Sequence, residues 1–323
     1  MIEQYNSVLA PCIRSLINQK RVNGFSYRSE AIMLMRFDRL CVLYDLDEVK
    51  LPKALVDLWS EQDVNENLNT RNGRISCLRQ LAKHMMSLGY DVYYPKQIQS
   101  GEKAHPYVLS HEEIVALFSV IDHQTPNYKH PRRFIEEEKI MFRLFYCCGL
   151  RRSEVMNLRR DRVHFENGTI EIFGSKGDKD RIVFMPDDLR QMCSSYKDYI
   201  NVECPNSVWL FPGKDPSKTF ASSTLDVNFG RYWGRTRFYV NNGRHPTIHS
   251  LRHTFVVDKM NEWMAQGIDL RTMLPYLSKY LGHSTVNDTL YYYHLVDKAF
   301  ASVREKDTAF SKLIPEVIDY EDQ

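Results

Sequence analysis

A polar segment divides this sequence into two parts with different patterns. Residues 96–106 contain Gly and Pro and show no apolar periodicity, which is typical of a linker between domains. A chain of 323 residues with 43% apolar content can bury two medium-sized cores. The sequence therefore predicts one domain over residues 1–95 and a second over residues 107–298, followed by a short tail at residues 299–323.

The first part of the chain predicts helices without strands. Apolar residues recur there at the spacing of a buried helix face, and Gly89 is placed to end the last helix. Basic residues on these helices, among them Arg28, Arg71 and Arg74, are candidates to contact phosphate groups. A solvated helix face would give the same pattern. The predicted helices span residues 1–18, 26–44 (with a capping region at 26–29), 51–58 and 67–88.

Beyond the linker, helical and strand patterns alternate. Ser110 and Glu113 form a capping-box pattern that opens a helix through Ile121. Asn167 and Gly168 predict a two-residue hairpin turn between two short strands. The sequence thus predicts a fold that is mainly α with a small antiparallel β-sheet. Its strands are expected at residues 163–165, 169–173 and 181–185, and its other helices at 132–148, 154–158, from about 249 to 264, and 274–281.

A basic stretch at residues 229–253 contains no carboxylate. His249, Arg252 and His253 are spaced to share one face of a helix, while Ile248 and Leu251 can point inward. This pattern indicates a surface for an anion, although a solvated basic face remains open. A zinc site is disfavoured because the stretch lacks the Glu of the H-E-x-x-H motif and a third ligand. The other cations of the stretch are Arg231, Arg235, Arg237, Arg244 and His245.

Two further features each have a simple alternative. Residues 174–180 form a Gly-containing loop between strands that presents Lys176 and Lys179, but its spacing is not that of a nucleotide-binding P-loop. Tyr291, Tyr292 and Tyr293 are consecutive, and such clusters usually pack in cores. Neither feature defines a site by itself.

Composition excludes several classes of protein. No N-terminal signal pattern and no apolar run long enough to cross a membrane is present, so we expect a cytoplasmic protein without a membrane partner. The seven cysteines lack paired C-x-x-C spacing, which argues against a disulfide framework and a zinc site. The net charge of +2 is too small to indicate a nucleic-acid partner, so that argument depends on local clustering.

Five sequence features occur together in an informative order. They are GLRRSE at 149–154, Lys176 in a hairpin loop, HSLRH at 249–253, LGHS at 281–284, and a tyrosine nine residues after His283. This set resembles the tyrosine recombinases, also called the λ-integrase family, over roughly residues 109–296. The helical first part is similar to the core-binding domain of that family. The segment from Arg252 to His283 is longer than in Xer-type members, which resembles transposon-borne integrases.

The resemblance implies an enzyme that cleaves and rejoins DNA strands through a 3′-phosphotyrosyl intermediate. Two guanidinium groups would hold the phosphate, a lysine would protonate the leaving oxygen, and the tyrosine ester would conserve the bond energy without a metal ion, ATP or another cofactor. Tyr292 fits the family spacing; Tyr291 and Tyr293 are the alternatives. The implied catalytic residues are Tyr292 as nucleophile, Arg151 and Arg252 on the phosphate, Lys176 as acid, His249 as general acid or base, His283 on a phosphate oxygen, and Glu154 as a brace for Arg151.

The resemblance also implies the partners. Double-stranded DNA recombination sites would be bound by a clamp of two domains, and four protomers would assemble on two duplexes. Phe310, Leu313 and Val317 form a helical stripe in the tail, which would dock on a neighbouring protomer or pack on its own domain. The need for an accessory protein or a second recombinase is left open. Candidate DNA contacts are Arg231, Arg235, Arg237, Arg244, Lys179, Arg28, Arg71 and Arg74.

Several functions are compatible with this chemistry. We expect integration or excision of a mobile element by a bacterial, nucleoid-associated protein, because of the long segment between Arg252 and His283. A recombinase that resolves chromosome dimers is the alternative within the family. A type IB topoisomerase would use the same residue types to relax supercoils, whereas a DNA-binding repressor would need no nucleophilic tyrosine.

Overall fold

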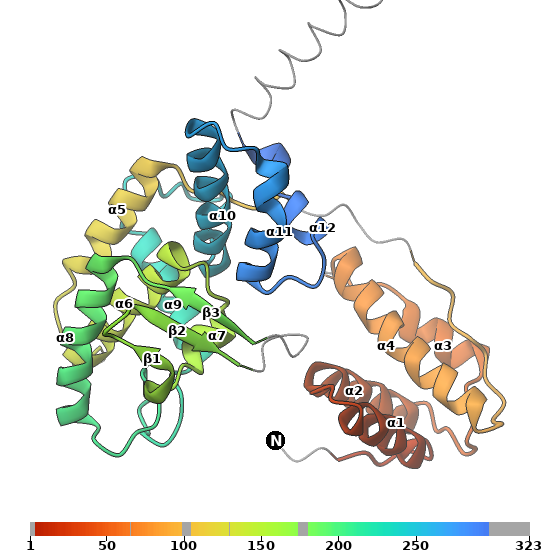
Figure 1. Ribbon diagram of the computed structural model, residues 1–323. Helices are drawn as coiled ribbons and strands as arrows, with labels where there is room; N and C mark the ends of the chain where they lie inside the picture. Colours follow the sequence, from red (N-terminus) through yellow and green to blue (C-terminus); the bar gives the residue numbers. More distant parts are fainter. Residues whose placement is uncertain (1–3, 65, 99–104, 129, 174–179, 297–323) are drawn as a thin grey trace, which may run out of the picture. The chain divides into compact units, whose positions relative to one another are not determined.

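The computed structural model describes residues 4–64, 66–98, 105–128, 130–173 and 180–296 (Figure 1). The chain falls into two compact units, Met1–Ala104 and His105–Gln323, and each is described here by itself. The predicted fold class, mainly α with a small antiparallel sheet, is confirmed. Within the described residues, no helix is both long and apolar enough to span a membrane.

The first unit is a small helical bundle around helix α4. Helix α4 packs against the other three helices, and the ring of Phe37 meets the ring of Trp59 edge-on at 5.1 Å in the shared core. Gly89 follows α4 in a left-handed conformation, as predicted. The bounds of the four helices are α1 Ala10–Val22, α2 Arg28–Leu43, α3 Lys53–Ser60 and α4 Leu68–Ser87.

One predicted helix start in this unit is wrong. Helix α1 begins at Ala10 instead of residue 1, because the buried carboxylate of Asp38 accepts hydrogen bonds from the backbone N–H groups of Asn6 and Ser7 at 2.7 and 3.1 Å. These bonds hold Asn6 and Ser7 outside the helix. Helix α2 begins at Arg28, and its N-cap residue, Tyr27, lies in the expected capping region at 26–29, although it has a φ of 46° and makes no side-chain capping hydrogen bond.

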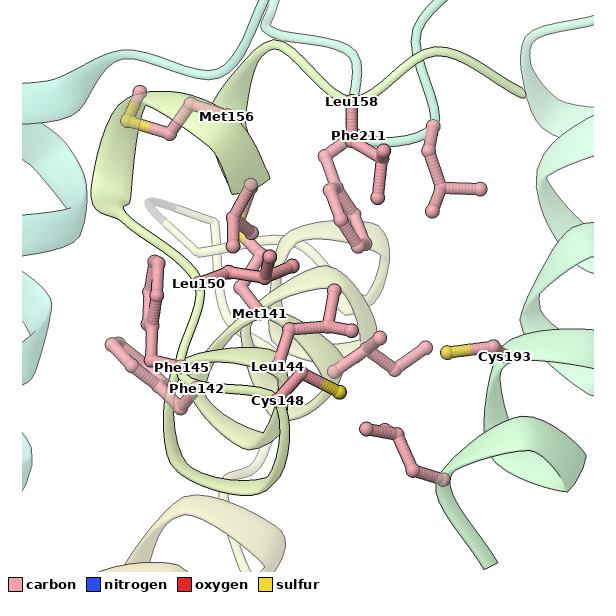
Figure 2. Packing of buried hydrophobic residues seen from close by; sticks show 14 of the residues in the cluster. Met141, Phe142, Leu144, Phe145, Cys148, Leu150, Met156, Leu158, Cys193 and Phe211 are labelled. Atoms are coloured by element: carbon pink, nitrogen blue, oxygen red, sulfur yellow. The ribbon is translucent and has the colours of Figure 1, made fainter. Parts of the chain in front are cut away.

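The second unit is organised around helix α6 (Arg132–Cys147), which packs against α5 (His111–Asp122), α7 (Arg152–Met156), α8 (Asp187–Glu203) and α10 (Ile248–Ala265). Figure 2 shows Met141, Leu144 and Phe145 of α6 among the side chains of this core. The predicted capping box of Ser110 and Glu113 is confirmed at the start of α5. The remaining helices are η1 Arg160–Arg162, α9 Ser222–Trp233, α11 Leu270–Leu281, α12 Asn287–Leu290 and η2 Tyr293–Leu295.

The sheet has three antiparallel strands in the order β1 (Val163–His164), β2 (Thr169–Ile172) and β3 (Arg181–Phe184). The predicted two-residue turn at Asn167-Gly168 is wrong. His164 pairs with Thr169, so four residues connect β1 to β2. The side chain of Asn167 accepts hydrogen bonds from the N–H and the hydroxyl of Thr169, and Gly168 has a φ of 68°. The two residues thus still shape the turn, at its second half.

A second cluster of apolar residues joins α10 and α11 to the segment after α12. It contains Phe255, Leu274, Leu281, Tyr292 and Val296. Helix α11 begins at Leu270, four residues before its predicted start, and accommodates Pro275 within its first turns. This cluster brings the histidines and arginine of α10 to the tyrosines near residue 292.

Candidate active site

Arg252 is buried at the centre of the second unit. Helix α10 begins after a capping box formed by Thr247 and Ser250, and Ile248 and Leu251 are buried as predicted. Arg252 is only 1% exposed, so it is not part of an open cationic face. Its guanidinium donates to the backbone oxygens of Gly149 and Leu281, the latter at 2.8 Å. These bonds fix the position of the charge before any anion binds.

Two glycines allow the backbone to approach these arginines. Gly149 has a φ of 60°, and a Cβ atom there would lie 2.4 Å from Cδ1 of Phe255. Gly282 has a φ of 66° and follows α11, and its carbonyl oxygen accepts a hydrogen bond from Arg151. The glycines of the GLRRSE and LGHS motifs therefore have structural roles that join separate parts of the site.

Glu154 braces Arg151, as the resemblance implies, and it also holds a second arginine. Its carboxylate accepts from the backbone N–H and Nη1 of Arg151 at 2.8 and 2.9 Å, and from both terminal nitrogens of Arg181 at 2.9 and 2.7 Å. Burial raises the pKa of Glu154, but the hydrogen bonds from Arg181 and Arg151 outweigh it, and the net pKa is below the ordinary value. The carboxylate is thus ionised and holds the two arginines together.

His283 touches Arg252 directly. Nη2 of Arg252 lies 3.1 Å from Nε2 of His283, and Nδ1 of His283 lies 2.7 Å from the hydroxyl of Thr289. Because an arginine can only donate, this arrangement fits a neutral imidazole that carries its proton on Nδ1. Burial and the charge of Arg252 lower the pKa of His283 to about 4, which agrees with the neutral form.

The two histidines of α10 pack edge-on against each other. The rings of His249 and His253 meet edge-on with centroids 4.4 Å apart. His249 is exposed, but partial desolvation of its ring, followed by the charges of Arg252 and Arg151, lowers its pKa, and burial lowers the pKa of His253 to about 3. Both imidazoles are therefore neutral at pH 7, and the positive charge of the site comes from its arginines. Arg252 remains charged because its pKa is lowered only to about 10, mainly by burial.

Tyr292 is the tyrosine of the Tyr291–Tyr293 trio that lies against this histidine cluster. Its hydroxyl is 2.6 Å from Nδ1 of His253, and the residue is 5% exposed. Burial raises the pKa of Tyr292 to about 12, although the charges of Arg252 and Arg151 oppose the shift. The tyrosine is therefore neutral and held beside the arginines that would bind a phosphate.

The structure thus brings together Arg151, Glu154, His249, Arg252, His283 and Tyr292 in one unit. Lys176 and Lys179 lie outside the described residues, so their predicted roles stay predictions. Three residues of the site received no role from the sequence: His253, Arg181 and Thr289. His253 was recognisable only as a member of the HSLRH motif. Arg181 is far in sequence from Glu154, and Thr289 carries no motif, so neither could have been identified from spacing.

The predicted DNA-binding arginines lie outside the buried cluster. Arg231, Arg235, Arg237 and Arg244 are exposed on the second unit. In the first unit, Arg71 donates to the backbone oxygen of Ser60 at 2.8 Å, and Arg74 pairs with Glu66 at 2.6 Å and also donates to backbone oxygens at the end of α3. These bonds hold Arg74 against its own unit, whereas Arg28 is exposed. Their contacts with DNA stay predictions.

Among the described residues, no group of three or more His, Cys, Asp or Glu side chains is arranged to hold a metal ion.

Comparison with known proteins identifies the family of this chain. The model of the phage integrase family matches residues 108–299. The chain belongs to this family. Its members are the tyrosine recombinases, enzymes of DNA strand transfer that need neither a metal ion nor ATP.

Curated relatives and solved structures agree with this placement. The chain is 28% identical to the tyrosine recombinase XerA of Thermococcus kodakarensis over 65% of its own length and 66% of the relative's length. It is 24% identical to the putative integrase/recombinase y4rB of Sinorhizobium fredii, covering 88% of this chain and 92% of that protein.

Two solved structures share the fold of this integrase-family chain. The Tn1549 transposon integrase in complex with a circular intermediate DNA matches with a TM-score of 0.62 at 17% identity, over 91% of this chain and 99% of that one. A lambda integrase dimer bound to a core site matches with a TM-score of 0.60 at 12% identity, over 86% and 94% of the two chains. This protein therefore has the fold of the tyrosine recombinases.

Proposed function

We propose that this tyrosine recombinase acts at specific DNA sites to integrate or excise a mobile element. The proposal rests on two side-chain contacts in the second unit. Arg252 contacts His283, and the next residue, His253, contacts Tyr292. Such a set suits one phosphate group and a tyrosine nucleophile. The long segment between Arg252 and His283 and the shared fold with the Tn1549 transposon integrase favour the mobile-element role. Resolution of chromosome dimers is the second candidate, because several relatives are Xer recombinases.

The geometry supports a direct transesterification. The phenol of Tyr292 gives up its proton, for which we propose His249 as the acceptor, and its oxygen attacks phosphorus. The bond from phosphorus to the 5′ oxygen breaks, and the 5′ oxygen takes up a proton, for which we propose Lys176 as the donor. Arg151 and Arg252 stabilise the charge that grows on the non-bridging oxygens. Because Glu154 and backbone carbonyls hold both guanidiniums in place, little reorganisation is needed at the moment of reaction. Rejoining is the reverse reaction with a new 5′ hydroxyl.

Assembly is the second part of the proposal. We infer that four protomers act on two DNA duplexes at the chromosome of a bacterial cell, with residues 299–323 linking neighbours. A pocket of about 530 Å³ on the second unit offers a surface for the apolar stripe of that segment; Trp263, Tyr276 and Tyr280 line it together with Lys259. The segment 306–323 holds five acidic and two basic residues, which suits a pocket with a lysine at its wall.

Covalent capture tests the proposal without knowledge of the target site. The protein would be incubated in EDTA with sheared genomic DNA of its host, and adducts would be isolated under denaturing conditions and sequenced. Wild type should form an adduct at a defined sequence, Tyr292→Phe should form none, and the matched variants Tyr291→Phe and Tyr293→Phe should retain it. An adduct that survives in Tyr292→Phe would show that the nucleophile is another residue.

The captured sequences also separate the candidate functions. Sites at both ends of one element support integration and excision, whereas a single chromosomal site supports dimer resolution. A type IB topoisomerase activity would instead relax a supercoiled plasmid that lacks any captured site. If wild type forms no adduct in the presence of its host DNA, a repressor role gains support.

A further inference from the structure

The hydrogen bond between His253 and Tyr292 places the candidate nucleophile in the site, but the roles proposed above assign none to His253. His253 lies on α10, and Tyr292 lies between α12 and η2. Nδ1 of the imidazole and the phenolic hydroxyl are 2.6 Å apart, and the two ring centroids are 5.4 Å apart with a tilt of 44° between the rings. The contact therefore joins the candidate nucleophile to the residue that follows Arg252 in the chain.

The protonation states of both partners follow from their surroundings. Burial, then His249, Arg252 and His283, lower the pKa of His253 to about 3, whereas burial raises the pKa of Tyr292 to about 12. The phenol consequently keeps its proton and the imidazole is neutral. A phenolic O–H is a stronger donor than the N–H of a neutral imidazole, and an imidazole nitrogen is the stronger acceptor, so we assign Nδ1 as the acceptor and place the ring proton on Nε2.

We infer that His253 is a positioning residue for the nucleophile. Its Nδ1 accepts a hydrogen bond from the hydroxyl of Tyr292, which leaves a lone pair of the phenolic oxygen free to attack the phosphate. The inference rests on the proposed function, since it takes Tyr292 as the nucleophile. With its O–H directed at His253, the phenol presents its lone pairs elsewhere. The neighbouring residue, Arg252, is the one that would hold the phosphate.

The surroundings of His253 restrict its ring. His249 packs edge-on against it at a centroid distance of 4.4 Å, and Tyr292 is itself fixed in the apolar cluster with Leu281 and Val296. The positions of Tyr292 and of Arg252, the proposed phosphate ligand, thus both depend on one turn of α10. Because attack depends on alignment, a displacement of about 1 Å can cost about 10²-fold in rate.

A proton-accepting role is the alternative for the same contact. With the pKa of His253 near 3 and that of Tyr292 near 12, transfer to the imidazole is strongly unfavourable before the phosphate is bound. The two roles differ in what can replace the histidine. Asn places an amide oxygen near the position of Nδ1 and can accept the hydrogen bond, but it cannot take a proton.

The test measures single-turnover cleavage of a captured duplex that carries a nick next to the cleavage point, with saturating protein. His253→Leu should lower the rate constant about 10²-fold, and His253→Asn should recover most of the loss. Both variants should bind the duplex as wild type does, and thermal melting should confirm that they fold. His164→Leu is the matched control, because His164 lies on β1 beside Glu171 and away from the cluster.

A duplex with sulfur in place of the bridging 5′ oxygen locates the defect. Its thiolate leaves without protonation when the tyrosine–phosphorus bond forms, so the His253→Leu defect should persist if the residue acts on the nucleophile. The inference is overturned if His253→Leu cleaves like wild type, if His253→Asn is as slow as His253→Leu, or if sulfur removes the defect. The proposed function itself fails by a different result, the absence of any covalent adduct from wild type.

Discussion

At the scale of single residues, the site depends on buried charges that are held by hydrogen bonds. Arg252 and Glu154 are both buried, and each makes several hydrogen bonds within the second unit. A buried charge is costly unless such partners compensate for lost water. The positions of Arg151 and Arg252 are therefore set by the fold, so the phosphate that we propose they bind would enter an arrangement that already exists.

Replacement of Glu154 by Gln tests this arrangement. The variant loses the charge that holds Arg151 and Arg181, so we expect its free energy of unfolding to fall by about 1–3 kcal/mol and cleavage to slow. Glu171→Gln is the control, because Glu171 pairs with Arg162 in a more exposed position and should change stability by less than about 1 kcal/mol. Denaturant unfolding followed by tryptophan fluorescence gives both values. Equal effects of the two substitutions would argue against a special role for Glu154.

The neutral histidines predict how stability depends on pH. The pKa of His283 is about 4 in the folded chain and near 6.5 when unfolded. Between these values the unfolded state binds more protons, so the contribution is complete above pH 6.5 and is lost as pH falls toward 4. For this group, we expect the free energy of unfolding at pH 5 to be lower by at most about 2 kcal/mol than above pH 6.5. His283→Asn should flatten that part of the profile; an unchanged slope would mean that His283 is already charged in the folded state.

At the scale of elements, the sequence predicted those with strong local signals. The capping box at Ser110, the three strands and the helix around Arg252 are confirmed within a few residues. Helices α8 and α9 were not predicted, although Leu225 and Phe229 of α9 are buried four residues apart. Their polar residues and weak stripes gave little periodic signal. The start of α1 was wrong because it depends on Asp38, which is far away in sequence.

Some residues of the candidate site could likewise be predicted from local sequence motifs, whereas others are brought in by contacts between residues that are far apart in the sequence. Motif order selected Arg151, Arg252, His283 and Tyr292, and the structure brings them together. Arg181 joins Glu154 only through the folding of β3 against α7 and α11, which no local pattern encodes. The residues proposed to contact the phosphate therefore carry recognisable sequence patterns, whereas those that support them are defined by tertiary contacts.

Replacement of Gly149 tests the turn that follows α6. Gly149→Ala would place a Cβ atom 2.4 Å from Cδ1 of Phe255 at a φ of 60°, so we expect a loss of about 1–3 kcal/mol in stability and a displaced Arg252. Gly230→Ala in α9 is the matched change, since no atom lies within 4 Å of its Cβ position. It should stabilise the chain by roughly 0.5–1 kcal/mol. The melting temperatures of the two variants should therefore shift in opposite directions, and only Gly149→Ala should slow cleavage.

At the scale of the whole molecule, the proposed catalysis and the proposed assembly would use different parts of the second unit. The candidate catalytic cluster lies between α7, α10 and the end of α11, whereas the pocket lined by Trp263, Tyr276 and Tyr280 lies along α10 and α11. Helices α10 and α11 therefore contribute to both.

Mixing two defective proteins distinguishes docking on a neighbour from docking on the same chain. Tyr276→Glu adds an acidic group at a 70% exposed pocket residue and should repel the acidic segment 306–323, while deletion of residues 299–323 removes the segment. Each change alone should leave binding of one duplex intact and reduce complexes of two duplexes in a native gel. In a mixture, the intact segment of the first variant can enter the intact pocket of the second, so docking between protomers restores part of the assembly. Docking within one chain restores none, because neither variant holds both halves of the contact.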